Sequence, residues 1–155
     1  MKKLLLLLTH LVALAAGFAL GIYALPILVA PPAPSAQEVS KLASEAAFKG
    51  RFRRDLKDSD ALHWGEGEVS VGAKAIALAG EIAPGPDYKL YLSPRFVETE
   101  EDFKRLRPEM VRVGEVKTFS NFVVPVPSSV DVERFDTVVI WCESFSQFIT
   151  AAKYR

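Results

Sequence analysis

The sequence predicts an all-β domain, a small sandwich or barrel of about seven to nine antiparallel strands, preceded by one N-terminal transmembrane helix and a short linker helix. Two observations support this prediction. An uncharged apolar segment follows two N-terminal lysines, and beyond residue 50 the hydrophobic period changes to the alternation typical of strands. We expect an anchor over 1–30, a proline-rich linker and short helix over 31–49, and the β domain over 50–155.

The segment from Leu4 to Ala30 contains no charged residue. About 20 apolar residues in a helix cross the hydrocarbon core of a membrane, so this segment is long enough to do so. Lys2 and Lys3 favour a cytoplasmic N-terminus, which puts the C-terminal domain of this single-pass protein on the periplasmic or extracellular side of the cell membrane. The alternative is a signal peptide cleaved after Ala13-Leu-Ala15, which would also export the domain.

Prolines at positions 26, 31, 32 and 34 are expected to end the first helix and to form a short stiff spacer. Ser35 and Glu38 have the spacing of a capping box. They predict a second, short helix that has Val39 and Leu42 on one face and is stopped by Gly50. We interpret this helix as a stalk or lid without chemistry of its own.

The domain contains short alternating runs separated by turn signals such as Pro84-Gly-Pro-Asp87. Strands are expected at 66–71, 75–82, 88–92, 111–119, 122–126, 137–142 and 145–152. The charged stretch 98–107 is the exception. Its Glu100–Lys104 and Glu101–Arg105 spacings suit a short exposed helix or a charged loop.

Charge and cysteine content exclude several classes of function. The chain has 19 basic and 19 acidic residues, so no basic field indicates a nucleic-acid partner. Cys142 is the only cysteine, which excludes an intrachain disulfide, a CxxC pair and a cysteine-based zinc site. No metal site is expected, and no phosphate-loop, nucleophile-elbow or zincin motif is present. A lone exported thiol does permit a disulfide-linked dimer.

The C-terminal stretch from Val138 to Phe148 resembles the most diagnostic segment of the DM13 domain family. Upstream features that follow the family's order are Gly50-Arg-Phe52, His63, Gly67, Pro84-Gly-Pro-Asp87, Tyr91-Leu-Ser93, Gly114, Lys117, Pro125, Val130-Asp131, Phe135 and, near the end, Ala152. The resemblance covers 50–155. One departure is Phe119-Ser-Asn-Phe122, where relatives more often carry a glycine and a tyrosine.

The resemblance implies a membrane-tethered, all-β module of the periplasm or cell exterior, proposed for the family as part of an electron-transfer or oxidative-modification system. The family's cysteine is its proposed redox centre, either as a thiol or as a ligand to a prosthetic group such as haem. This role is transferred here to Cys142 alone. A redox protein partner is implied, while the cofactor, the electron donor or acceptor and any enzymatic activity are left open.

Cys142 ends an expected strand on the face opposite to Trp141. A buried unpaired cysteine is common in cores, so a structural role and a redox role are both open. A reactive thiolate usually needs a nearby cation or a helix N-terminus. The neighbouring Glu143 would oppose ionisation if it approached the sulfur, which favours ligation of a prosthetic group or a partner disulfide over a free nucleophile.

Three further residues are candidates for the site. His63 is the only histidine outside the anchor, and beside Cys142 it could complete an axial pair or move a proton. The alternative is a histidine bonded to backbone at a strand end. Trp141 and Phe148 could line a pocket for a planar cofactor, or could simply be core. The second class of function is therefore a non-catalytic envelope binding or structural β domain with a buried structural cysteine.

Overall fold

The computed structural model describes the whole chain, from Met1 to Arg155. It contains eight strands, in antiparallel pairs that form two four-stranded sheets, as the sequence predicted. The first sheet has the order β1-β2-β3-β6, with β1 Phe48–Phe52, β2 Gly65–Val71, β3 Ala75–Ile82 and β6 Ser120–Pro125. The second has the order β5-β4-β7-β8, with β5 Val111–Val116, β4 Tyr88–Ser93, β7 Thr137–Cys142 and β8 Gln147–Lys153.

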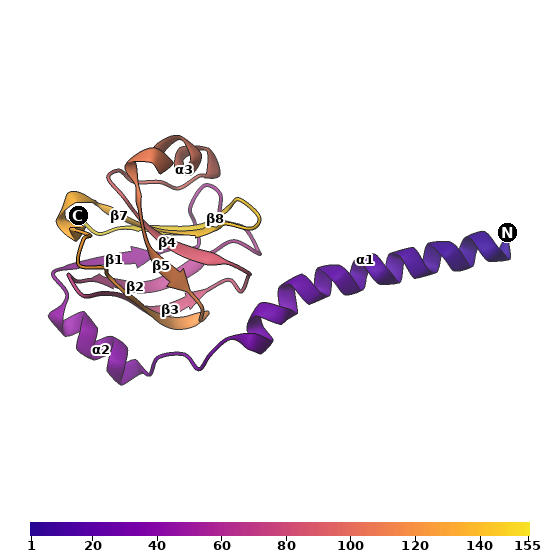
Figure 1. Ribbon diagram of the computed structural model, residues 1–155, viewed down its shortest axis with the longest axis horizontal. Helices are drawn as coiled ribbons and strands as arrows, with labels where there is room; N and C mark the ends of the chain where they lie inside the picture. The colour runs from indigo at the N-terminus through magenta and orange to yellow at the C-terminus, as the bar shows by residue number, and fades with distance from the viewer.

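The two sheets form a sandwich, with the main core between them (Figure 1). This core takes the inward side chains of both sheets, including Leu78 and Val69 from one and Leu90 and Ile140 from the other, all fully buried. Because the side chains of a strand alternate between its two faces, the other residues of each strand point out of the sandwich. The all-β sandwich is thus confirmed.

Strands β4 and β7 are buried at every position because helix α3, Glu100–Leu106, covers the outer face of their sheet (Figure 1). Phe103 and Leu106 of α3 enter a second apolar cluster that contains Trp141 and Tyr91. The expected ion pair between Glu100 and Lys104 is present, whereas Arg105 pairs with Asp102 instead of Glu101. The stretch is therefore a helix with one buried face rather than a fully exposed one.

Helix α2, Ala36–Glu45, begins with the expected capping box of Ser35 and Glu38. It ends at Glu45, before the glycine that was expected to stop it, and Gly50 lies inside β1, a strand that the sequence analysis did not assign. Val39 is buried, and α2 contacts β2, β3 and β6. The linker helix thus packs against the sandwich and is not a free stalk.

Asn121 connects the linker to the first sheet. Its side-chain amide donates to the carbonyl of Pro34 at 3.2 Å, and its side-chain oxygen accepts from the amide of Gly80 at 3.1 Å. The residue has a φ of 51°, which asparagine tolerates better than most residues, and it lies where the register of β3 and β6 shifts. Asn121, part of the segment that departs from the family pattern, therefore ties the linker to β3.

Helix α1, Lys2–Val29, runs through Pro26 and extends away from the sandwich (Figure 1). It ends three residues beyond the first proline that was expected to terminate it, and none of its residues is buried. The helix is long and apolar enough to cross a membrane.

Candidate functional site

Cys142 is the last residue of β7 and faces the core between the two sheets. Its side chain is only 2% exposed. Trp141 belongs to the cluster on the opposite face of the sheet, so the alternation expected along β7 is correct. The residue directly across from Cys142 on the neighbouring strand is Tyr88, which shares the same core.

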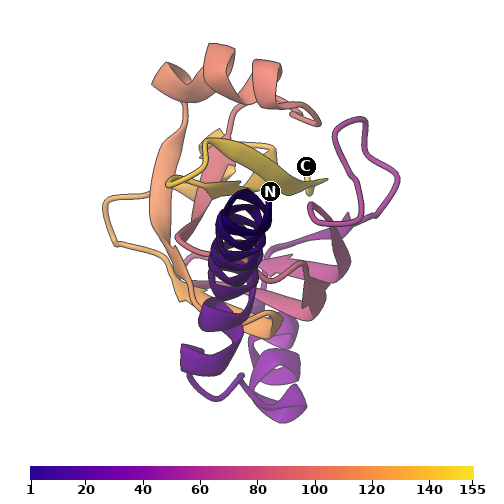
Figure 2. The ribbon, with the colours of Figure 1, turned by 90° about the vertical axis from the view of Figure 1, so that its right-hand side faces the viewer.

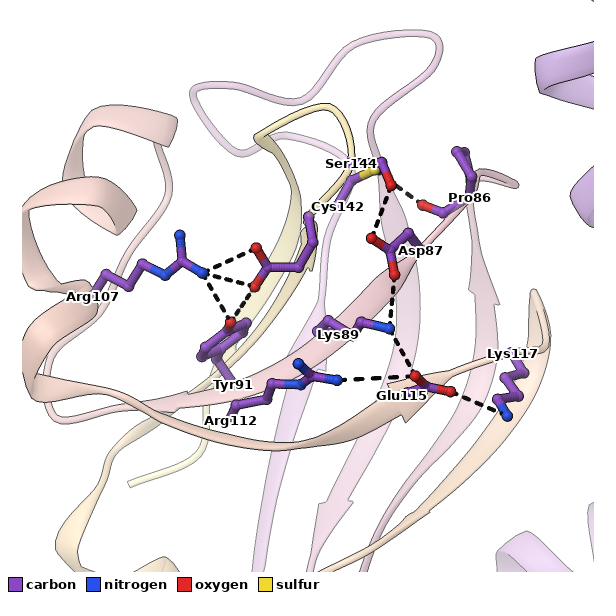
Figure 3. Close-up of polar contacts among 11 residues, drawn as sticks. Pro86, Asp87, Lys89, Tyr91, Arg107, Arg112, Glu115, Lys117, Cys142 and Ser144 are labelled. Atoms are coloured by element: carbon purple, nitrogen blue, oxygen red, sulfur yellow. Dashed lines mark hydrogen bonds and ion pairs between the residues drawn. The ribbon is translucent and has the colours of Figure 1, made fainter.

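The turn that follows Cys142 is fastened to the turn that precedes β4 (Figure 3). The Cys142 thiol donates to the carbonyl oxygen of Pro86 at 3.0 Å, and the Glu143 amide donates to the carbonyl of Asp87 at 3.2 Å. The Ser144 hydroxyl donates to an Asp87 carboxylate oxygen at 2.9 Å. Three contacts therefore hold the sulfur against the Pro84-Gly-Pro-Asp87 turn, which the sequence analysis interpreted only as a turn.

An ion pair with Lys89 holds Asp87 in place. Its carboxylate lies 2.7 Å from Lys89 Nζ, and Lys89 also reaches Glu115 at 2.9 Å (Figure 3). The hydrogen bond from Lys89 keeps the pKa of Asp87 below its usual value, so the carboxylate is charged at neutral pH. Lys89 thereby stabilises the turn that contacts Cys142, although it does not touch the sulfur.

The Glu143 carboxylate pairs with Arg107, the residue that follows α3. Its carboxylate accepts from Arg107 Nη2 at 3.0 Å and from the hydroxyl of Tyr91 (Figure 3). Burial, followed by the hydrogen bond to Glu143, raises the pKa of Tyr91. The repulsion of a Cys142 thiolate by Glu143 that the sequence suggested is therefore a minor effect.

Burial is the main cause that raises the pKa of the Cys142 thiol above its ordinary value of 9.0. The backbone amides of Phe145 and Ser144 lower the pKa, and the Asp87 and Glu143 carboxylates raise it further, with an upward net shift. The sulfur is therefore a neutral thiol at physiological pH, in agreement with the hydrogen bond that it donates to Pro86.

This upward shift predicts a pH dependence of thiol alkylation. We expect iodoacetamide to modify Cys142 of the folded protein with a pH midpoint above 9.0, measured by mass spectrometry across an alkaline series. The thiol has a lower pKa in the unfolded chain than in the folded protein. Its contribution to the free energy of unfolding is therefore fully present below the unfolded pKa and is lost as the pH rises through the folded pKa. A midpoint at or below the value of an unfolded control would contradict this expectation.

A pocket of about 370 Å³ lies beside Cys142, and His63 lines the same pocket. The other lining side chains that matter here are Tyr88, Phe145 and, from α1, Tyr23. His63 Nδ1 lies 2.9 Å from an Asp60 oxygen, and the pKa of Asp60 is lowered mainly by this hydrogen bond. With Nδ1 as the donor to a carboxylate, Nε2 is the ring nitrogen that can accept a proton.

Trp141 and Phe148 do not share this pocket. They are opposite one another on β7 and β8 and lie in the cluster under α3, where Trp141 stacks on Phe103 with ring centroids 3.9 Å apart. The structure thus brings His63 to the Cys142 pocket and leaves the two aromatic candidates on the other face of the sheet. The indole Nε1 of Trp141 is buried without a hydrogen-bond partner.

The sequence analysis missed Pro86 and Tyr88 as neighbours of the sulfur. Gly85 also belongs to the site, because a Cβ at that position would collide with the Tyr88 ring. The pairing of two expected strands could have identified these neighbours from the sequence. If 88–92 and 137–142 are antiparallel neighbours, the beginning of the first must lie beside the end of the second.

The residues around Cys142 do not fit a haem ligated by this sulfur. A thiolate ligand must be deprotonated and open to the iron, whereas this thiol is protonated, almost completely buried and directed at the Pro86 carbonyl. The two aromatic rings expected to enclose a planar group lie on the far face of the sheet. No cluster of three or more histidine, cysteine or carboxylate side chains that could hold a metal ion is present.

Comparison with known proteins gives one match. No curated protein and no solved structure is significantly similar to the chain. The family model described as Electron transfer DM13 matches residues 52–154, which include every strand from β2 to β8 together with Cys142 and His63. The chain therefore belongs to the DM13 family of electron-transfer domains.

Proposed function

We propose that this protein is a membrane-tethered redox module of the periplasm or cell exterior, with Cys142 as its redox centre. Helix α1 is the tether, and its flanking lysines favour a cytoplasmic N-terminus. Membership of the electron-transfer family supports the class of reaction. The observation that carries the proposal is that the only thiol of the chain and its only histidine outside α1 line one pocket.

The reaction that these groups support is exchange with a disulfide of a partner protein. A bond forms between Cys142 Sγ and one partner sulfur as the partner's disulfide breaks. Because Cys142 is buried and donates to the Pro86 carbonyl, this step requires the turn over the sulfur to open and that hydrogen bond to break. His63 Nε2 takes the thiol proton and delivers it to the departing partner thiolate. Cys142 is thereby oxidised to a mixed disulfide, and the released partner sulfur is reduced. A base speeds this exchange because the thiolate is the attacking species and burial raises the pKa of the Cys142 thiol.

The test uses the full chain in detergent with a chromogenic aromatic disulfide as the partner disulfide. We expect the folded protein to release one equivalent of coloured thiolate at pH 7, and Cys142→Ala to release none. His63→Gln should slow the release on the order of 100-fold, since general acid–base catalysis typically contributes at least that much. Asp60→Asn keeps the imidazole and removes its carboxylate partner, so it should slow the release less than His63→Gln does.

A second candidate function is a binding or structural domain of the envelope in which Cys142 is only a core residue. The 2% exposure of Cys142 and its hydrogen bond to Pro86 favour this reading. It predicts that the thiol reacts only after the domain unfolds, at the same rate in wild type and His63→Gln. That result would overturn the redox proposal. Non-reducing electrophoresis of the same samples tests the disulfide-linked dimer, which stays a prediction.

A further inference from the structure

Two of the three large apolar side chains that the domain exposes to solvent lie where α1 leaves it. Beyond α1 the exposed ones are Leu62 at 59%, Phe145 at 48% and Phe96 at 38%. Leu62 and Phe145 lie on two separate loops, yet they line the same pocket as Ala19, Ile22 and Tyr23 of α1. Viewed along α1, the helix projects toward the reader from this end of the sandwich (Figure 2).

The pocket that these two side chains line has no formally charged side chain, although the Asp60 carboxylate lies beside it and accepts from the Leu62 amide at 2.7 Å. The pocket is completed by the Pro84-Gly-Pro86 turn and by side chains that are apolar, aromatic or neutral polar. None of its lining residues is a lysine, arginine, aspartate or glutamate. Two exposed apolar side chains that share a pocket with the membrane helix make this end of the domain a candidate contact surface.

The length of α1 indicates what that occupant is. Its 28 residues extend about 42 Å at about 1.5 Å per residue, whereas the hydrocarbon core is about 30 Å thick. Counted from Lys2, about 20 residues cross that core, so the outer boundary lies near Tyr23. Tyrosine is enriched at this boundary because its ring is apolar and its hydroxyl is polar. Of the α1 residues that line the pocket, Ile22 and Tyr23 therefore lie at the outer boundary of the bilayer core, and Ala19 lies about one helical turn inside it.

We propose that the end of the domain formed by Leu62, Phe145 and the Pro84-Gly-Pro86 turn is a membrane-docking surface. It rests on the lipid around α1, with Leu62 and Phe145 at the boundary between headgroups and acyl chains. The proposal rests on the membrane tether of the proposed function. The same surface lines the pocket of Cys142 and His63, so a partner disulfide reaches Cys142 only when this end of the domain is lifted from the lipid. It gives the domain a fixed orientation, with its C-terminal end away from the membrane (Figure 1).

The test places an environment-sensitive fluorophore on single cysteines in full-length Cys142→Ser protein. The protein is reconstituted into nanodiscs of phosphatidylcholine and phosphatidylglycerol that contain spin-labelled lipids as quenchers. The two test positions are Leu62→Cys and Phe145→Cys. Leu11→Cys, within α1, reports the tether, and Glu133→Cys reports the opposite end, where the Val132 carbonyl accepts from Tyr154 near the C-terminus.

We expect labels at 62 and 145 to shift to shorter emission wavelengths and to be quenched most by spin labels near the headgroup. The label at 11 should be quenched by deep spin labels, and the label at 133 should behave as in water. Quenching at 11 with aqueous behaviour at 62 and 145 would overturn the docking surface and keep the tether. Loss of quenching at 11 would overturn both. A Phe145→Glu substitution should remove the shift of the label at 62, and circular dichroism checks that each variant is folded.

Discussion

Replacing Trp141 by alanine is expected to lower the free energy of unfolding by about 3–5 kcal/mol, the usual cost of truncating a buried aromatic side chain. Trp141 is 1% exposed and stacks on Phe103, which meets Tyr91 edge to face. These rings join α3 to the outer face of the second sheet. Urea unfolding of the full chain in detergent, followed by circular dichroism, measures the change as a shift in midpoint.

Trp141→Phe is the matched variant. The indole Nε1 has no hydrogen-bond partner, so phenylalanine removes an unpaired buried donor while keeping most of the stacked ring. We expect it to cost less than Trp141→Ala, because phenylalanine keeps a ring against Phe103 and leaves a smaller cavity, and to leave the rate of Cys142 exchange unchanged. A stable Trp141→Ala variant with altered exchange at Cys142 would instead make Trp141 part of the thiol site.

Much of the sandwich could be predicted because strand alternation is a local property. Strands β3 and β7 were assigned with their observed bounds, and the division of β7 into a Cys142 face and a Trp141 face was correct. Strand β1 was missed because its sequence, Phe-Lys-Gly-Arg-Phe, is short, has two charged residues and contains a glycine. It becomes a strand by pairing with β2, which no local pattern reveals.

The start of β8 shows a second limit of prediction from the sequence. The alternating run was expected to resume at Phe145, yet β8 begins at Gln147 because residues 143–146 form a turn in which Ser146 has a φ of 52°. Nothing in the composition of Glu143-Ser-Phe-Ser146 requires that backbone conformation. The exposed position of Phe145, on which the docking surface depends, follows from this turn.

The site itself was only partly predictable. Cys142 and His63 were identified one by one, but their shared pocket is assembled from separate segments, including α1 and the turn before β4. Trp141 and Phe148 were grouped with Cys142 because they are close in sequence. The period of two in strands separates them, since a residue next to Cys142 must point to the opposite face.

Gly67→Ala is expected to destabilise the domain by about 3–5 kcal/mol, which combines backbone strain with a steric clash. Gly67 has a φ of 123°, a conformation that residues with a Cβ rarely adopt. A Cβ there would also meet the Ala79 carbonyl and lie 2.6 Å from the Cα of Gly80, its partner on β3. Neither obstacle is a flexible side chain, so relief requires β2 and β3 to move apart.

Gly72→Ala provides the control for this prediction. A Cβ at Gly72 would have its nearest contact at 3.4 Å, and the residue does not have a positive φ. Replacing it should change the stability by less than about 1 kcal/mol, and in the favourable direction if the unfolded chain loses freedom. If both variants unfold at the same urea concentration, the close approach of β2 and β3 at Gly67 is not required by the fold. A large loss of stability confined to Gly67→Ala would show that the close approach of two backbones requires glycine there. β-Strand propensity does not reveal this cause.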